Sequence, residues 1–218
     1  MSKIISVGLY GNRANHDELG HFASEIFETL DYNKNFSVTK LDSTKAEHLD
    51  VVVYAARSPK KLQDATRLCA KLDIPLILLS SDMQKELDLL KPACRVQVVP
   101  NSSVEIQDYH KLVVEFYKKH PDWQITLTEY HQESKTDTSG TALAIAKDIK
   151  VSPEKILSIR DDKLAKLHFE IPEQNLNSYA IHQVTFNNSS TDLSQTFEIK
   201  VFGRRTYTEG LIQLINWV

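Results

Sequence analysis

The first hundred residues alternate between short apolar runs and helix-like segments, and this alternation limits the available folds more than any other feature. Segments 22–30, 60–72 and 82–90 carry apolar residues at helical spacing. Strands that alternate with helices are typical of a parallel sheet with right-handed crossovers. We therefore predict an α/β fold that begins with a Rossmann-like parallel-sheet domain. Its expected strands are 3–7, 36–41, 51–54, 75–79 and 95–99.

The pattern changes after residue 103. Segment 104–119 has the pattern of a longer amphipathic helix, and residues 206–218 have that of a final helix. We expect residues 1–103 to form the first domain and residues 104–205 to form an α+β domain with a mostly antiparallel sheet. The final helix is expected to pack back on the first domain. The strands expected in the second domain are 123–128, 155–160, 167–171, 179–186 and 196–202.

Composition narrows the function classes. Hydrophobic residues make up 41% and charged residues 25% of the 218 residues, which are globular values. The net charge of −3 gives no broad footprint for nucleic acid, and no apolar run approaches the roughly 18 residues of a membrane span. Two isolated cysteines, Cys69 and Cys94, indicate a reducing compartment. With residues 1–7 running straight into a strand pattern, we expect a cytoplasmic protein without nucleic-acid or membrane partners.

The end of the first predicted strand has a glycine-containing turn, GLYGNRA at residues 8–14. Glycine at a strand-to-helix turn lets backbone N–H groups approach a pyrophosphate. A tight turn without a ligand is an equally good interpretation. Asp42 ends the second strand, where an acidic side chain accepts hydrogen bonds from a ribose, although it also suits a capped turn.

The strongest local signal is EYHQESKTDTSGTAL, residues 129–143. The small residues 139–141 precede a helical run, and the amide groups at such a helix start suit a carboxylate. His131 and Lys135 lie upstream on an expected loop, where a histidine can shuttle a proton and a lysine can hold an anion. The alternative is an N-capped helix after a polar loop. We interpret His182 as structural, and because the histidines lack metal-ligand spacing we predict no metal site.

This motif resembles that of the dihydrodipicolinate reductase (4-hydroxy-tetrahydrodipicolinate reductase) family, of the diaminopimelate route to lysine. The family pattern is E-x-H-H-x-x-K-x-D-x-P-S-G-T-A-L. Weaker matches follow in the right order over nearly the whole chain, at residues 8–13, 51–59, 79–82, 100–104 and 204–210. The residues that match the main pattern are Glu129, His131, Lys135, Asp137, Ser139, Gly140, Thr141, Ala142 and Leu143.

The chain also departs from the family pattern, as a divergent and shortened member. Gln132 stands in place of the second histidine, and one residue is missing between Asp137 and Ser139. Residues 79–82 (LSSD) replace a Gly-Thr-Thr-Gly turn. These departures affect the fit of the cofactor and the substrate more than the fold.

The resemblance implies a reductase that uses NADPH or NADH, with His131 and Lys135 as catalytic residues. It also implies a homotetramer, formed through the second domain, and a small dicarboxylate substrate docked between the domains. Two alternatives stay open: a reductase of another small anionic imine or enone, and a relative that binds a nucleotide or dicarboxylate without turnover. The implied substrate-binding residues are Gln132, Ser139, Gly140 and Thr141. The implied cofactor-binding residues are Gly8, Leu9, Tyr10, Gly11, Asn12, Arg13, Asp42, Leu79, Ser80, Ser81, Pro100, Asn101 and Ser102.

Overall fold

The computed structural model describes residues 4–11, 20–41, 48–80, 83–99 and 101–216. The chain forms two compact units. Unit 1 comprises Met1–Ser102 and Tyr207–Val218, and unit 2 comprises Ser103–Thr206. Within the described residues, no helix has the length and apolar character that a membrane crossing requires.

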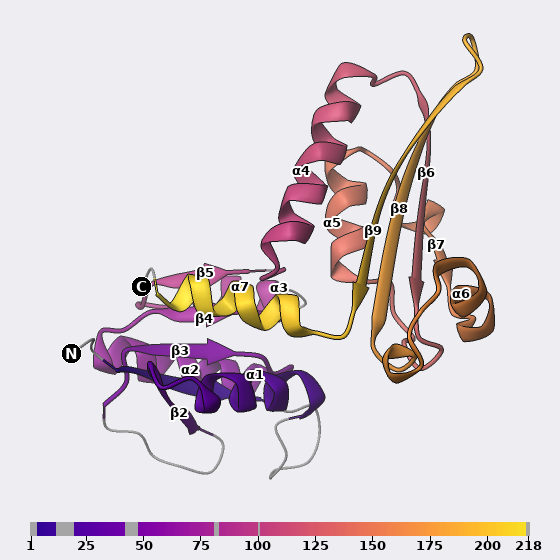
Figure 1. Cartoon of the computed structure of the whole chain (residues 1–218). Helices are drawn as coiled ribbons and strands as arrows, with labels where there is room; N and C mark the ends of the chain where they lie inside the picture. The colour runs from indigo at the N-terminus through magenta and orange to yellow at the C-terminus, as the bar shows by residue number, and fades with distance from the viewer. Residues whose placement is uncertain (1–3, 12–19, 42–47, 81–82, 100, 217–218) are drawn as a thin grey trace. The chain divides into compact units, whose positions relative to one another are not determined.

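Unit 1 contains a five-stranded parallel sheet in the order β2-β1-β3-β4-β5 (Figure 1). All of its strand pairs are parallel, so the predicted Rossmann-like sheet is confirmed. In this order β2 and β3 lie on opposite sides of β1, so the direction in which strands are added reverses there. Ligands of such folds bind at the carboxyl ends of the strands near this point. The strands are β1 (Ile5–Tyr10), β2 (Phe36–Lys40), β3 (Val51–Tyr54), β4 (Leu76–Leu78) and β5 (Val96–Val98).

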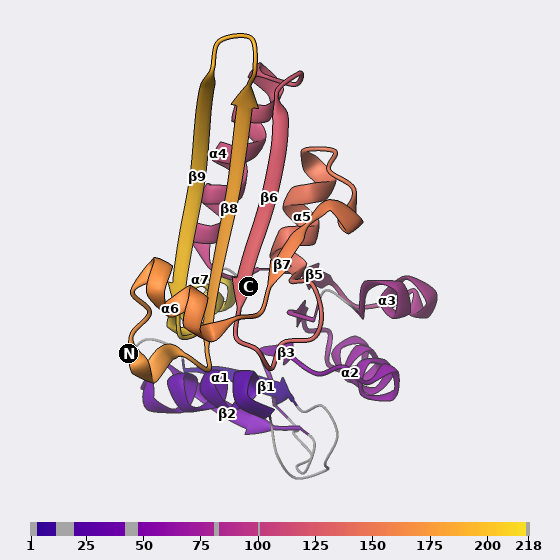
Figure 2. The same cartoon turned by 90° about the vertical axis from the view of Figure 1, so that its right-hand side faces the viewer.

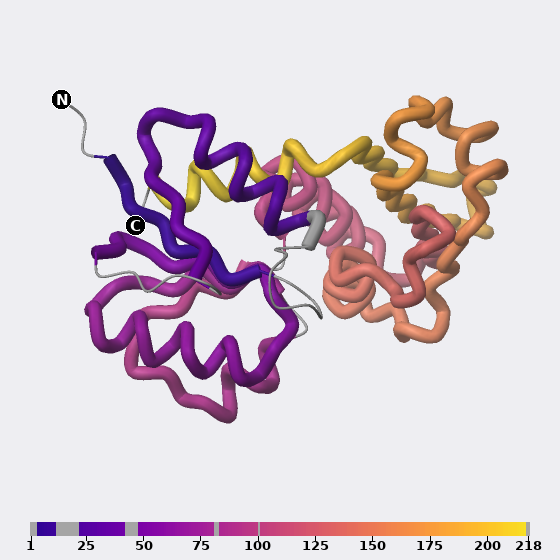
Figure 3. Tube along the Cα trace, turned by 90° about the horizontal axis from the view of Figure 1, so that it is seen from below, coloured from indigo at the N-terminus to yellow at the C-terminus, as the bar shows by residue number. Residues whose placement is uncertain are grey.

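Helices cover both faces of this sheet. Figure 3 shows α1 (Gly20–Tyr32) and the yellow α7 (Arg205–Ile215) on one side, and α2 (Pro59–Leu72) with α3 (Gln84–Leu90) on the other. Alternate side chains of β3 enter the two cores, Val51 and Val53 on the α1 side and Val52 and Tyr54 on the α2 side. This two-sided burial explains the continuous apolar run 51–54. From α7, Leu211 and Ile215 join the core that contains α1.

Unit 2 contains a four-stranded sheet in the order β7-β6-β8-β9 (Figure 2). Strands β6 (Gln124–His131), β8 (Tyr179–Asn188) and β9 (Leu193–Phe202) are antiparallel, and the short β7 (Leu157–Ile159) runs parallel to β6. Figure 1 shows α4 (Val104–Lys119) and α5 (Gly140–Asp148) on one side of this sheet. Their apolar side chains pack on Leu127, Val184 and Phe186, which form the centre of this core.

The predicted strand at 167–171 is wrong, because Asp162–Phe169 forms helix α6. The Asp161 side chain caps this helix by accepting a hydrogen bond from the Leu164 amide at 2.9 Å. Ala165 and Phe169, four residues apart, lie on the buried side of α6. The helix ends at Glu170, which has a left-handed backbone with φ 54°. Burial of two residues at helical spacing therefore outweighs the alternation of apolar and polar residues over 167–171.

Candidate active site

Strand alternation in unit 2 brings three ionisable side chains to one buried face. Glu129 and His131 lie on β6 at two-residue spacing from Leu127, and so on the face that α4 and α5 cover. His182 lies directly opposite Glu129 on β8. His131 therefore ends a strand, whereas we expected it on a loop. The Glu129 side chain has no exposed surface, and the exposed fractions of the His131 and His182 side chains are 11% and 1%.

The Glu129 carboxylate is the centre of the hydrogen-bond network. One oxygen, Oε1, accepts from Arg160 Nη2 at 2.6 Å and from Ser158 Oγ at 2.9 Å. The other, Oε2, accepts from the Ser139 amide at 3.1 Å and from the Ser139 hydroxyl. A buried carboxylate is tolerated only with such a set of donors and a cation beside it.

Ser139 connects this carboxylate to helix α5 and to His182. Its hydroxyl donates to Glu129, and its oxygen accepts from the Ala142 amide at 3.1 Å as the N-cap of α5. Because that hydroxyl proton is used, the contact of 2.9 Å to His182 Nε2 must be a bond donated by His182. His182 is therefore the tautomer with its proton on Nε2. The Ser139 hydroxyl is fully occupied by these three bonds.

Burial and charge set the protonation states of the cluster. Burial alone would raise the pKa of Glu129, but hydrogen bonds from Arg160 and Ser139 outweigh it and the pKa lies below its usual value. Burial lowers the pKa of His131, and the nearby His182 lowers it further. Burial also lowers the pKa of His182. In the isolated protein at neutral pH, both histidines are thus neutral and Glu129 is ionised.

Lys135 lies on the tight turn that follows β6. Its amide donates to the Gln132 carbonyl at 3.0 Å, and its ammonium pairs with Asp137 Oδ1 at 2.7 Å. The Lys135 side chain is 19% exposed. The ammonium acts on the His131 ring electrostatically, since it is among the charges that lower the pKa of that histidine. Lys135 and His131 thus belong to one electrostatic environment.

The remaining predicted substrate-binding residues lie beside this cluster. Helix α5 begins at Gly140, followed by Thr141, and the amides of a helix's first turn have no acceptor within the helix. Gly140 is exposed, and Thr141 and Gln132 are half-buried. An anion can therefore approach the N-terminus of α5 through the main chain, whereas the Ser139 hydroxyl is already engaged.

Glu129, His131 and His182 each offer a potential metal ligand, and these atoms lie within 4.8 Å of one another. Hydrogen bonds from Arg160, Ser158 and Ser139 already fill both oxygens of the carboxylate. The Arg160 guanidinium, 2.6 Å from Glu129, would also repel a second cation. We therefore assign no metal to this cluster.

The predicted cofactor-binding residues belong to unit 1, and most described members follow a strand of the parallel sheet. Gly11 follows β1, Leu79 and Ser80 follow β4, and Asn101 and Ser102 follow β5. The Lys61 ammonium, on α2, donates to the Gly11 carbonyl at 3.1 Å. The Ser102 hydroxyl donates to the Tyr207 carbonyl at 2.6 Å, which leaves mainly its backbone for a ligand. Asn12, Arg13, Asp42, Ser81 and Pro100 lie outside the described residues.

Gly8 has a different position from the one expected. Strand β1 continues to Tyr10, so Gly8 lies within the strand and not in the turn after it. A Cβ at this position would stand 2.6 Å from Leu41 Cδ1 and 2.8 Å from Leu49 Cδ1. A side chain at this position would therefore require the ends of Leu41 and Leu49 to shift. Leu9 is fully buried, and Tyr10 is nearly so.

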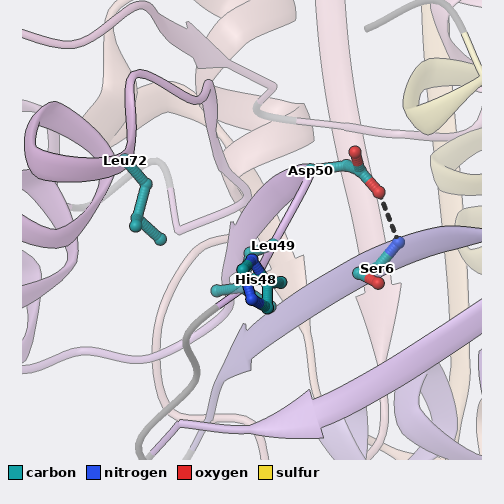
Figure 4. Close-up of a pocket in the computed structure, with 5 residues that line it drawn as sticks. All are labelled: Ser6, His48, Leu49, Asp50 and Leu72. Atoms are coloured by element: carbon teal, nitrogen blue, oxygen red, sulfur yellow. Dashed lines mark hydrogen bonds between the residues drawn. The ribbon is translucent and has the colours of Figure 1, made fainter.

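A surface pocket of about 250 Å³ in unit 1 is lined by Ser6, His48, Leu49, Asp50 and Leu72 (Figure 4). Asp50 Oδ2 accepts from the Ser6 amide at 2.8 Å, which ties the start of β3 to β1. This pocket lies at the amino ends of the strands, the opposite edge from the one where such sheets bind nucleotides. We assign it no role in the reaction.

Sequence reasoning missed three members of the cluster. Arg160 and Ser158 come from β7 and the residue after it, and only the parallel pairing of Glu129 with Ser158 brings them to the carboxylate. His182 was interpreted as structural and given no part in the site; its bond to Ser139, the N-cap of the motif helix, is consistent with a structural role. Glu129 belonged to the motif but had no assigned role. Two-residue alternation from Leu127 through Glu129 to His131 was the one signal that could have shown a shared buried face.

Comparison with known proteins identifies the family of this chain. The family model described as "Dihydrodipicolinate reductase, C-terminus" matches residues 106–218, more than half of the chain. The chain belongs to the dihydrodipicolinate reductase family. The resemblance seen in the 129–143 motif is thus confirmed.

Curated members of this reductase family align over most of the chain. It is 23% identical over 187 residues to 4-hydroxy-tetrahydrodipicolinate reductase 1, chloroplastic, of Arabidopsis thaliana, covering 80% of this chain and 54% of that protein. A probable 4-hydroxy-tetrahydrodipicolinate reductase 2, chloroplastic, of Oryza sativa subsp. japonica is 24% identical over 189 residues, covering 79% and 57%. The chain thus spans little more than half the length of these relatives.

A solved dihydrodipicolinate reductase has the same fold. The dipicolinate-bound enzyme from Paenisporosarcina sp. TG-14 superposes with a TM-score of 0.63 at 18% identity. The match covers 98% of this chain and 94% of that one. At this identity, the likeness supports the fold of the reductase family and not a particular substrate.

Proposed function

We propose that this chain reduces 4-hydroxy-tetrahydrodipicolinate, the hydrated form of dihydrodipicolinate, to tetrahydrodipicolinate with NADPH or NADH. Membership of the reductase family supports this proposal. The observation that carries it is the Glu129–Ser139 network, which fastens the end of β6, with His131, to the start of α5. A proton-transferring group and an anion-binding helix start are thereby held in one place.

The substrate's carboxylates bind to the cationic and amide donors of unit 2. One carboxylate accepts from the Gly140 amide at the start of α5, where the helix dipole also favours negative charge. Lys135 pairs with the substrate by turning its ammonium from Asp137, a half-exposed partner that is readily exchanged. Gln132 lies on the same turn, and its side-chain amide donates a hydrogen bond to the substrate.

His131 transfers the proton that completes the reduction. The 4-hydroxyl of the substrate leaves as water, which gives dihydrodipicolinate with a ring double bond conjugated to the imine. When bound, the nicotinamide cofactor supplies a hydride to a ring carbon of this conjugated system. The electron-rich ring that results takes one proton, which His131 gives. His131 is neutral in the isolated protein, but a dianionic substrate favours its charged form because opposite charges attract. Substrate binding therefore favours the protonated, acidic form of His131. Lys135 balances the remaining negative charge of the substrate.

The carboxyl edge of the parallel sheet in unit 1 would hold the cofactor. Gly11, Ser80 and Asn101 follow β1, β4 and β5 along this edge, as the fold requires of a dinucleotide site. The Lys61 ammonium beside Gly11 suits the negative charge of a pyrophosphate. From the family resemblance we also propose a homotetramer, which light scattering of the purified chain tests.

An optical assay tests the proposed reaction. Purified chain is mixed with NADPH or NADH and with substrate made in situ by the preceding condensing enzyme, and cofactor oxidation is followed. We expect turnover that falls by about 100-fold or more in His131→Ala, since general acid catalysis contributes about 100- to 10,000-fold. His168→Ala, on the exposed side of α6, is the matched control and keeps full activity.

Three outcomes separate the functions considered. Turnover that depends on His131 and Lys135 supports the proposal. Cofactor oxidation with another cyclic imine, but not with this substrate, indicates a divergent reductase. Tight cofactor binding with no oxidation of any imine contradicts an enzymatic role and favours a binding protein.

A further inference from the structure

Arg160 makes more contacts in the cluster than its place at the end of a three-residue strand would suggest. Its Nη2 donates to Glu129 Oε1 at 2.6 Å and to the Asp137 carbonyl at 3.0 Å. Its Nε donates to the Lys135 carbonyl at 2.9 Å, and its Nη1 to the Ile159 carbonyl at 3.0 Å. One side chain thus joins β7, the buried carboxylate of β6 and the turn that follows β6.

The two carbonyls that Arg160 binds belong to residues 135 and 137, on the segment that carries the Lys135 ammonium. This segment is a bend with one backbone turn, from the Lys135 amide to the Gln132 carbonyl. The Arg160 bonds fix it a second time, from the β7 side. Glu129 fixes Arg160 in turn, because its carboxylate has no exposed surface and needs a cation beside it.

We propose that Arg160 is a positioning residue that sets the place of the Lys135 ammonium relative to His131, through its bonds to the backbone of residues 135 and 137. This inference rests on the proposed function, in which Lys135 holds the substrate. Four of the five N–H groups of Arg160 already donate to protein oxygens, so we assign Arg160 a supporting role and no contact with the substrate. The guanidinium is required for its shape, because only a planar fork of donors reaches the carboxylate and both carbonyls together.

Arg160→Lys keeps the charge and removes the fork, so it separates shape from charge. In the protein without ligand, we expect amide hydrogen exchange over residues 133–138 to become at least tenfold faster. In steady-state kinetics, we expect KM for the dicarboxylate substrate to rise by about 10- to 100-fold, since misplacing a binding group by about 1 Å can cost about 100-fold. KM for NAD(P)H stays within twofold, because the cofactor binds unit 1. A loss of folding alone would not split the two KM values in this way.

Arg67→Lys, on an exposed position of α2, is the matched control and leaves exchange and both KM values unchanged. If Arg160→Lys does not fold, the double variant Arg160→Met/Glu129→Gln removes both buried charges, and the same rise in substrate KM is expected. An Arg160→Lys protein with wild-type exchange and wild-type substrate KM overturns the inference.

The exchange measurement keeps the test separate from the proposed function. If the wild-type chain reduces no imine, the proposed function fails, and the positioning role is decided by exchange alone. Faster exchange over residues 133–138 then supports it, and unchanged exchange contradicts it. If the wild-type chain is active, both readouts must move together.

Discussion

At the scale of one residue, the buried carboxylate of Glu129 holds the elements of the site together through the donors that it requires. Removing a carboxylate from water costs several kcal/mol, and this cost is recovered only when donors surround it. Arg160, Ser158 and Ser139 provide those donors. The same bonds fasten β6, β7 and α5 to one another around the catalytic candidates. Stability and orientation of the site therefore depend on one side chain.

Ser139→Ala should destabilise unit 2 more than the loss of an ordinary helix cap. The change removes the α5 cap, worth about 1 kcal/mol, and takes one donor from the buried carboxylate, at a further cost of about 1–3 kcal/mol. Asp161→Ala is the matched control, because it removes only the cap of α6. Urea unfolding, followed by tryptophan fluorescence, measures the loss of stability in both variants. Equal losses in the two variants would contradict the role given to Ser139.

The buried histidines predict acid sensitivity. Their folded-state pKa values lie below the ordinary value of 6.5. Below that pH, the two histidines are therefore protonated in the unfolded chain before they are protonated in the folded chain. The free energy of unfolding therefore falls as pH falls below about 6.5, with a slope that approaches about 1.4 kcal/mol per pH unit for each histidine. Glu129, whose pKa is also lowered, adds to this loss below its ordinary value of 4.5.

His182→Gln tests this pH dependence, since the glutamine amide retains a donor near Ser139 but does not titrate. Unfolding of the variant between pH 7.5 and 5 should show about half the wild-type slope. His168→Gln is the control, because His168 is exposed, and it should keep the full slope. A His182→Gln protein with the wild-type slope would show that His182 is not buried in its neutral form.

At the scale of elements, Gly8 shows how a glycine inside a strand contributes to packing. Its lack of a side chain makes room for Leu41 and Leu49. We expect Gly8→Ala to cost about 1 kcal/mol, at the low end for overpacking, because the ends of the two leucine side chains can shift. Thermal unfolding measures this cost. The penalty should shrink in a Leu49→Ala background, where space is available. An equal penalty in both backgrounds would point instead to the backbone of β1.

Elements could be predicted from the sequence where the pattern that determines them lies in adjacent residues. Segments 51–54 and 104–119 were predicted to the residue, because burial on both faces and helical spacing leave a pattern in adjacent residues. Helix α6 was not predicted, because residues 167–171 alternate between apolar and polar, as a strand does. The cap at Asp161 and the two buried residues of α6 are a weaker local signal. For the site, the motif placed His131, Lys135 and the start of α5 close in sequence. Arg160 and His182 reach Glu129 only through strand pairing, which no local pattern encodes.

At the scale of the whole molecule, the two units differ in how the chain builds them. Unit 2 is one continuous segment, and its main core uses only residues from 109 to 199. Unit 1 is completed by the end of the chain, because Leu211 and Ile215 belong to its core. Unit 2 should therefore fold by itself, whereas residues 1–102 alone should not reach the stability of the intact unit.

Two fragments test this difference by circular dichroism and NMR. Fragment 103–206 should show a cooperative thermal transition and dispersed amide signals. Fragment 1–102 loses two core side chains, each worth about 2–5 kcal/mol, and should unfold in much less urea than unit 1 of the whole chain. A disordered 103–206 fragment would contradict the view that the cluster is built within unit 2.

The central claim is that the Glu129 cluster, Lys135 and the start of α5 form one dicarboxylate-binding site. A titration of the isotopically labelled whole chain with pyridine-2,6-dicarboxylate, followed by NMR, tests it most directly. The account predicts that the amides of Gly140 and Thr141, the Lys135 ammonium and the His131 ring shift together along one binding curve. Signals that stay fixed at these four groups up to millimolar ligand, or shifts confined to the pocket of Ser6 and Asp50, would contradict it.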